Sequence, residues 1–296
     1  MRLGIGLPTY LGNVIEPRAV LDWARRADAA GFAAVAVHDR PHADTYDPLA
    51  TLAAVAAVTE HVRLATTVVL LPTRDEALLV KQAAVVDRLS NGRLDLGVGV
   101  GGRANDFELF GRSFAGRGRE YERQLDRINE LWAGAIASEE SGTELGPAPI
   151  QRPRPPLWVG GYAPASIDRA VRLGDGYIFG AAGVAGMAAK IPAIREAAAA
   201  ADRSGFPVAG LAYVLLSTDA GEIADAEALL TRYYQHLHKP FNDLVAVGDE
   251  RAMEATIAAY RDAGVDLLHL IPVSRSADQI ERIAAVAGVG AAAPGA

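Results

Sequence analysis

The chain has 296 residues, of which 50% are hydrophobic and 22% charged, so it can form one large domain or two small ones and is not expected to be disordered. Its net charge of −7, without a basic block, argues against nucleic acid and anionic membrane surfaces as partners. There is no cysteine, which excludes disulfides, thiolate metal sites and a thiol nucleophile. No apolar run has the ~18 residues that a membrane span needs, and the chain begins directly with a strand, so we expect a cytoplasmic protein.

Apolar, β-branched runs alternate with segments of helical periodicity along the whole chain. The predicted strands are Leu3–Leu7, Ala33–Val37, Leu64–Leu71, Leu94–Val100, Leu157–Gly161, Gly176–Phe179, Val208–Leu216 and Val265–Pro272. The predicted helices are Pro17–Ala30, Pro48–Thr59, Glu76–Leu89, Arg117–Trp132, Pro164–Leu173, the alanine-rich surface helix Ala185–Ala201, Ile223–His236 and Glu250–Ala263.

Continuous apolar strands that alternate with helices predict a parallel sheet covered on both faces. Eight such units in a chain of this length are the number found in a (β/α)8 TIM barrel, and a doubly wound sheet is the alternative. No change of composition marks a second domain. We therefore expect a single domain over residues 1–296, in which Ser138–Pro156 is an insertion loop and 285–296 a frayed tail.

The stretch Asp87–Gly111 delivers a buried strand into a glycine-rich loop. Gly97, Gly99 and Gly102 match G-x-G-x-x-G, the dinucleotide fingerprint, but that motif belongs to the first strand–helix turn of a βαβ unit. Here three strand–helix units precede it, so we reject a Rossmann dehydrogenase. The glycines either let a ligand approach the backbone or only ease the packing of the barrel.

If the chain is a barrel, its site lies where the strands end at their carboxyl termini. This rim has few carboxylates, no Ser-His-Asp set and no strand lysine for a Schiff base, which disfavours an aldolase-type or metal enzyme. Glycines and apolar residues dominate it and suit a large flat cofactor that brings its own chemistry.

Individual rim residues have competing interpretations. His38 is either a proton relay or a packed histidine. Asp39 has a role at the cofactor or pairs with Arg40, and His42 and Tyr46 are candidates for the substrate pocket. His236 and His238 alternate like a ligand pair, but without a third ligand we favour a lid or helix end at Tyr233–Phe241 over a metal site.

Three segments resemble the luciferase-like flavin and deazaflavin oxidoreductases. The most specific is DRLSNGRLDLGVGVG at Asp87–Gly101, within a matching block at Asp47–Gly111. PLWVGG at Pro156–Gly161, followed by AVRLGDGYIFG, resembles the fifth and sixth strands of the family. VGDERAMEATIAAYRDAGVDLLHL at Val247–Leu270 resembles its closing segment.

The resemblance implies a barrel that binds reduced FMN or the deazaflavin coenzyme F420. The cofactor ring is expected over the third strand, where family members carry a non-prolyl cis peptide that here joins Thr67 and Val68. A small-molecule substrate, a separate flavin or F420 reductase and a homodimer are the partners that the resemblance suggests.

The match to the residues of the family is uneven. Asp39 falls on the Asp of the Asp-His pair of deazaflavin-dependent sugar dehydrogenases, but the His is Arg40 and their catalytic Glu falls on Gly102. Asn105 matches a loop Asn of these dehydrogenases. The phosphate-binding side chains of the sugar dehydrogenases and of bacterial luciferase are both missing from this sequence. Backbone amides could still hold the phosphate, with charge added by Arg275. The expected cofactor-binding residues are Thr67, Val68, Asn105, Gly160, Gly161, Gly180, Ala181 and Gly183, and the expected catalytic ones are His38, Asp39 and His42.

Three functions follow from this reading. The glycine pair Gly160–Gly161 and the compact chain favour hydride transfer with reduced F420. The alternatives are a monooxygenase that uses reduced FMN and O2, and a non-catalytic flavin-binding barrel, which the loss of the family's acid at Gly102 would favour.

Overall fold

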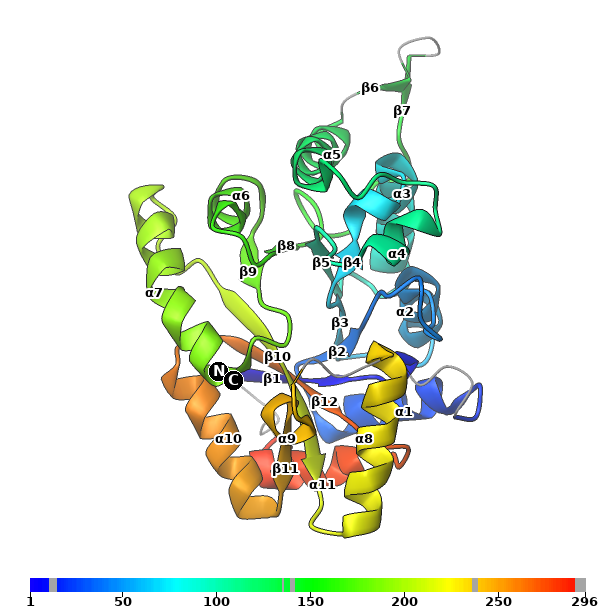
Figure 1. Cartoon of the computed structure of the whole chain (residues 1–296). Helices are drawn as coiled ribbons and strands as arrows, with labels where there is room; N and C mark the ends of the chain where they lie inside the picture. The colour runs from blue at the N-terminus through cyan, green and yellow to red at the C-terminus, as the bar shows by residue number, and fades with distance from the viewer. Residues whose placement is uncertain (11–14, 135, 139–141, 236–238, 291–296) are drawn as a thin grey trace.

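The computed structural model describes residues 1–10, 15–134, 136–138, 142–235 and 239–290 as one closed barrel surrounded by helices (Figure 1). The eight strands are parallel, as expected: β1 (Arg2–Gly6), β2 (Ala34–Val37), β3 (Arg63–Thr66), β5 (Leu94–Gly99), β8 (Leu157–Gly160), β9 (Gly176–Ile178), β10 (Val208–Leu216) and β12 (Leu267–Pro272). The first strand pairs with the last, from Arg2 opposite Leu267 to Ile5 opposite Leu270. This pairing closes the sheet and excludes the doubly wound alternative.

The eight predicted helices are present and cover the outside of the barrel (Figure 1). They are α1 (Ala19–Ala30), α2 (Pro48–Ala56), α3 (Glu76–Leu89), α5 (Arg117–Trp132), α6 (Ala165–Leu173), α7 (Gly183–Ala200), α8 (Ala220–Tyr234) and α10 (Glu250–Asp262). Aspartates begin four of them, because each carboxylate accepts a hydrogen bond from an otherwise unpaired backbone N–H of the first turn. These caps are Asp47, Asp75, Asp219 and Asp249.

Several short elements differ from the sequence prediction. The expected strand Leu64–Leu71 is broken into β3 and β4 (Val69–Leu70), followed by the 3-10 turn η2 (Leu71–Thr73). The expected insertion loop contains part of a hairpin, β6 (Ile136–Ser138) with β7 (Thr143–Glu144). The remaining unpredicted elements are α4 (Ala104–Glu108), α9 (Phe241–Leu244), β11 (Val245–Gly248) and α11 (Gln279–Ala287), the last of which reaches into the segment expected to fray. Apart from α11, with nine residues, these elements have two to five residues and are too short to show a hydrophobic period.

Apolar side chains fill two regions. The larger cluster lies between the barrel and its helices and includes Trp23, Leu52 and Leu125. The second lies inside the barrel and toward α8, where Trp158, Ile178 and Leu211 contribute aromatic and aliphatic groups. The second cluster forms the bottom of the site described below.

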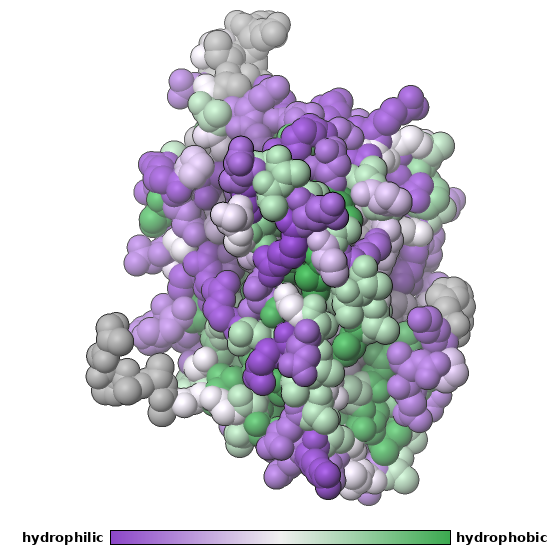
Figure 2. Space-filling view, turned by 90° about the vertical axis from the view of Figure 1, so that its left-hand side faces the viewer, coloured by the Kyte–Doolittle hydropathy of each residue, from purple (hydrophilic) through white to green (hydrophobic). Residues whose placement is uncertain are grey.

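The alanine-rich segment forms the surface helix that the sequence predicts. In α7, Met187, Ile191 and Ile194 are buried, while most of the intervening alanines are exposed. Figure 2 shows this side of the molecule, where hydrophobic and hydrophilic residues are interspersed. Within the described residues, no helix combines the length and apolar character needed to cross a membrane.

Candidate active site

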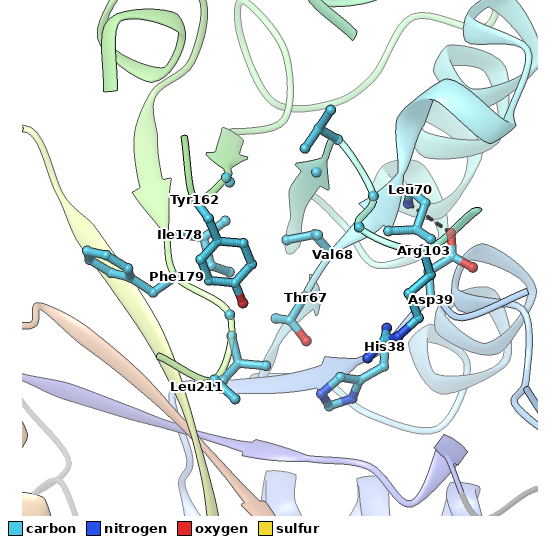
Figure 3. Close-up of a pocket in the computed structure, with 18 of the residues that line it drawn as sticks. His38, Asp39, Thr67, Val68, Leu70, Arg103, Tyr162, Ile178, Phe179 and Leu211 are labelled. Carbon is cyan, nitrogen blue, oxygen red and sulfur yellow. Dashed lines mark hydrogen bonds between the residues drawn. The ribbon is translucent and has the colours of Figure 1, made fainter. Parts of the chain in front are cut away.

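A cavity of about 480 Å³ opens at the carboxyl ends of the strands. Figure 3 shows its arrangement: Tyr162 and Phe179 lie on one side, Asp39 and Arg103 lie on the other, and Thr67 and Val68 lie between them. The lining residues come from six strand ends and from α8: His38, Asp39, Thr67, Val68, Leu70, Gly99–Arg103, Gly160–Tyr162, Ile178–Ala181, Leu211, Tyr213, Tyr233 and Tyr234.

Between the two sides, the break between β3 and β4 places Thr67 and Val68 at the cavity. The Thr67–Val68 peptide bond is cis, which confirms the expectation drawn from the resemblance. Ala65 pairs with Asp95 but Val69 pairs with Val98, so the broken strand holds one residue more than β5 over this interval. The Thr66 hydroxyl compensates for the lost backbone pairing: it donates to the Gly97 carbonyl at 2.7 Å and accepts from the Gly97 N–H at 2.8 Å.

Two glycines of β5 are required by this break. A Cβ atom on Gly97 would lie 2.1 Å from the Thr66 carbonyl oxygen, and one on Gly99 would lie 2.5 Å from Val68 Cγ2. Gly102, by contrast, has no atom within 4 Å of such a position. The glycines of this loop therefore have a packing role at Gly97 and Gly99 and leave open space at Gly102.

A second group of glycines forms the side on which Tyr162 lies. Gly160, Gly161, Gly180 and Ala181 line the cavity, and their role in binding a cofactor stays a prediction. A Cβ on Gly161 would lie 2.7 Å from Ser166 Cβ, and one on Gly180 would lie 2.3 Å from the Tyr162 hydroxyl. The lack of side chains here, next to the apolar Val68 and Ile178, fits a flat ring system with a phosphate-bearing tail.

Asp39 lines the cavity but its carboxylate is already engaged. Oδ2 accepts hydrogen bonds from the Leu70 backbone N–H at 3.0 Å and from Arg74 Nε at 3.1 Å. Burial raises the pKa of Asp39, and the Arg74 guanidinium opposes that rise. Arg74 also pairs with Asp47 at 3.0 Å. Because Leu70 and Arg74 flank η2, their bonds to Asp39 hold η2 against the end of β2. The ion pair considered for Asp39 is therefore made with Arg74, whereas Arg40 donates to the Tyr233 carbonyl.

His38 is buried at the cavity, and neither of its ring nitrogens has a hydrogen-bond partner in the described structure. Its ring stacks on Tyr213 with centroids 6.3 Å apart and meets Tyr10 and Tyr233 edge to face. Burial lowers the pKa of His38 to about 4, so the imidazole is neutral at pH 7. A neutral imidazole offers a bound molecule one N–H donor and one acceptor.

An aromatic group on α8 and β10 faces His38. The hydroxyls of Tyr213 and Tyr234 lie 2.9 Å apart, and the rings of Tyr233 and Tyr234 meet at 4.9 Å. The guanidinium of Arg103 lies 5.3 Å from the Tyr234 ring. The expected lid segment Tyr233–Phe241 includes two of these tyrosines, and Arg103 belongs to the stretch Gly99–Asn105 expected at the rim, whereas Tyr213 was not predicted. Tyr213 could be found only by noticing a polar tip inside a continuous apolar run.

Other expected residues lie outside the cavity lining, and their roles stay predictions. His42 is exposed and its backbone N–H donates to Asp106 at 3.2 Å. Asn105 lies half-buried in α4, and Gly183 begins α7. Arg275 pairs with Asp225 at 2.9 Å rather than adding charge to the cavity.

The expected lid segment is only partly described, since His236 and His238 lie outside the described residues. The described part of the chain has no group of three or more side chains that could hold a metal ion.

Comparisons with known proteins agree with this geometry. The family model described as luciferase-like monooxygenase matches residues 1–292. The oxygenase component of the flavin-dependent trigonelline monooxygenase of Acinetobacter baylyi is 34% identical over 137 residues, which are 43% of this chain and 38% of that protein. The alignments with curated relatives thus cover less than half of the length of those proteins.

Solved structures share the fold over nearly the whole chain. The monooxygenase RslO1 from Streptomyces bottropensis superposes with a TM-score of 0.82 at 24% identity, covering 98% of this chain and 97% of that one. An F420-dependent secondary alcohol dehydrogenase in complex with an F420–acetone adduct gives 0.78 at 19% identity, covering 96% and 97%. At these identities the likeness concerns the fold.

Proposed function

We infer the function from a premise that the match over residues 1–292 establishes: this chain belongs to the luciferase-like monooxygenase family and is an oxidoreductase. We propose that it binds reduced FMN against Thr67 and Val68 and uses it with O2 to oxygenate a small organic substrate. The observation that carries the proposal is the cavity itself, whose lining combines a glycine-rich wall and an apolar floor with a neutral histidine and three tyrosines.

The residues fit such a cofactor on two grounds. Gly160, Gly161 and Gly180 place backbone instead of side chains along this part of the cavity lining, which suits a flat ring and its tail. The unpartnered nitrogens of His38 offer hydrogen bonds to a molecule held in the cavity. Reduced FMN, when bound, supplies the electrons that activate O2.

The protein's own part is to position, to desolvate and to hold protons. Val68, Ile178 and Leu211 exclude water from the space over the floor. His38 is neutral at pH 7, so it can donate or accept one hydrogen bond without placing a charge beside the ring. Oδ2 of Asp39 is held by the Leu70 N–H and by Arg74, and the charge of Arg74 makes this carboxylate a weaker base toward a substrate.

This last point separates the two cofactor chemistries. Oxidation of an alcohol by hydride transfer needs a group that accepts the hydroxyl proton, and neither Asp39 nor His38, with its pKa of about 4, is poised for that near pH 7. Oxygenation by a cofactor that brings its own reactivity asks less of the side chains. These features support the FMN reaction over alcohol dehydrogenation.

Hydride transfer with reduced F420 is the second candidate. It is favoured by Gly160 and Gly161, the pair that the resemblance connects to deazaflavin enzymes, because both line the cavity. In that case the substrate would be a reducible bond, and O2 would not be consumed.

A separate reductase is part of the FMN proposal. The A. baylyi relative is named an oxygenase component, which indicates that its reduced flavin comes from another protein. We propose the same division of labour for this chain.

The test is a fluorescence titration of the purified protein with FMN and, separately, with F420. Tight binding of FMN, together with substrate-dependent O2 consumption when an NADH-driven flavin reductase is added, is the expected result. Tight F420 binding with weak FMN binding would select hydride transfer. If neither FMN nor F420 bound with a dissociation constant below ~100 μM, a binding free energy of about −5.5 kcal/mol, the assignment of the cavity to a cofactor would be refuted. Binding without turnover of any acceptor would favour the non-catalytic barrel.

A further inference from the structure

We propose that the substrate is a planar aromatic carboxylate, and that Arg103 binds its carboxylate. The proposal rests on the proposed function, since it assigns the half of the cavity that the cofactor would leave free. It is carried by the charge, the contacts and the position of Arg103.

Arg103 is the one cationic side chain among the described residues that line the cavity. It precedes α4, and its guanidinium lies over the Tyr234 ring at 5.3 Å. It makes no hydrogen bond or ion pair with the described part of the chain. Neighbouring arginines are engaged: Arg74 binds Asp39 and Asp47, and Arg117 donates to the Gly101 carbonyl. Five N–H donors at a cavity are therefore available to a ligand.

The acidic groups on this side of the cavity face other arginines. Asp39 is neutralised by Arg74, and His38 is uncharged. The buried Asp106 interacts with a second guanidinium, Arg40. Burial lowers the pKa of Arg40, and the neighbouring charge of Arg103 lowers it further. Among the described residues, Arg103 therefore has no ion partner of its own, which favours a bound anion on this side of the cavity.

The position of Arg103 separates this anion from the cofactor phosphate. Figure 3 shows Arg103 on the side of the cavity opposite Tyr162, with Thr67 and Val68 between. The glycine wall beside Tyr162 offers backbone to a phosphate. The planar fork of Arg103 matches a carboxylate or a phosphate, and its position away from the glycine wall favours the carboxylate of a substrate.

The surroundings of Arg103 define the rest of the substrate. Tyr233 and Tyr234 present rings that meet at 4.9 Å, and Tyr213 stacks on His38. A flat aromatic body can stack among these rings, and its carboxylate then reaches the guanidinium. His38 provides one further neutral hydrogen bond to a ring substituent.

The experiment compares 2-naphthoate with its neutral analogue 2-naphthamide, by calorimetric titration of the protein loaded with the cofactor that binds it. Wild type should bind the acid at least about tenfold more tightly than the amide. Arg103→Gln should bring that ratio close to one and leave cofactor affinity unchanged. Arg112→Gln removes the same charge from an exposed position outside the cavity lining and should keep the preference.

The outcomes separate this inference from the proposed function. A naphthoate that binds no better than the amide, or does not bind, overturns the inference. A variant Arg103→Gln that keeps the preference but loses affinity for the cofactor also overturns it, because the guanidinium then holds the cofactor phosphate. If neither FMN nor F420 binds while the acid preference depends on Arg103 in the unloaded protein, the anion site stands and the proposed function fails.

Discussion

Lowering the pH from 7 to 5 should destabilise the folded protein through two buried histidines, His38 and His269. Burial lowers the pKa of His38 to about 4 and that of His269 to about 3, against 6.5 for an exposed imidazole. The unfolded chain binds a proton at each site below pH 6.5, whereas the folded chain does not until near pH 4 or below. Stability is therefore full above pH 6.5 and falls as the pH drops. The 1.5 units between 6.5 and pH 5 correspond to about 2 kcal/mol for each histidine.

Urea unfolding at pH 7 and pH 5 measures this loss directly. His38→Gln should lose about 2 kcal/mol less than wild type between the two pH values. His61→Gln removes a histidine whose side chain is 82% exposed and should behave as wild type does. If wild type and His38→Gln lost the same unfolding free energy between pH 7 and pH 5, the reasoning would be refuted. His38 would then take up a proton in the folded state at pH 5, as a solvent-accessible imidazole does.

Three further predictions concern the parts that hold the cavity in place. Asp87→Ala should lower the free energy of unfolding in urea by at least about 3 kcal/mol. The fully buried Asp87 carboxylate accepts hydrogen bonds from the backbone N–H groups of Ile150 and Gln151 and from the Gln151 side-chain amide. Asp126→Ala, at an exposed position, should change the stability little. Asp39→Ala should cost about 3 kcal/mol by leaving Arg74 partly unpaired, so a loss of turnover without a loss of stability would instead indicate a catalytic Asp39. Gly99→Ala should weaken cofactor binding at least about tenfold, because the new Cβ would lie 2.5 Å from Val68 Cγ2 and displace Val68. Gly118→Ala, whose Cβ would have no neighbour nearer than 3.7 Å, should not weaken it.

The barrel was predictable because its strands are continuous apolar runs. Strands such as Val208–Leu216 must be buried on both faces. Eight such strands that alternate with helices can pack in few folds, of which the (β/α)8 barrel is one. The cis bond at Thr67–Val68 followed from the resemblance, since nothing in the local pattern Leu64–Leu71 signals a broken strand. That break depends on the Thr66 hydroxyl meeting Gly97, 31 residues along the chain.

The candidate site was predictable only where the backbone forms it. Gly160, Gly161 and Gly180 line the cavity because they end adjacent strands, which the strand order dictates. The engagement of Asp39 by Arg74, 35 residues away, depends on how loops fold over the rim. Arg103 gives no periodic signal, and only the structure shows that no described residue forms an ion pair or hydrogen bond with its guanidinium.

The closure of the barrel by β1 and β12 also has a consequence for biosynthesis. Arg2 pairs with Leu267, so β1 leaves the ribosome long before β12, the strand that closes the barrel against it. At roughly 5–20 residues per second, that delay is on the order of 10–50 s. Throughout it, the free side of β1 presents unpaired backbone groups to any other nascent chain. The interval before the ring of strands closes is therefore when a chaperone would do most to keep this protein from aggregating.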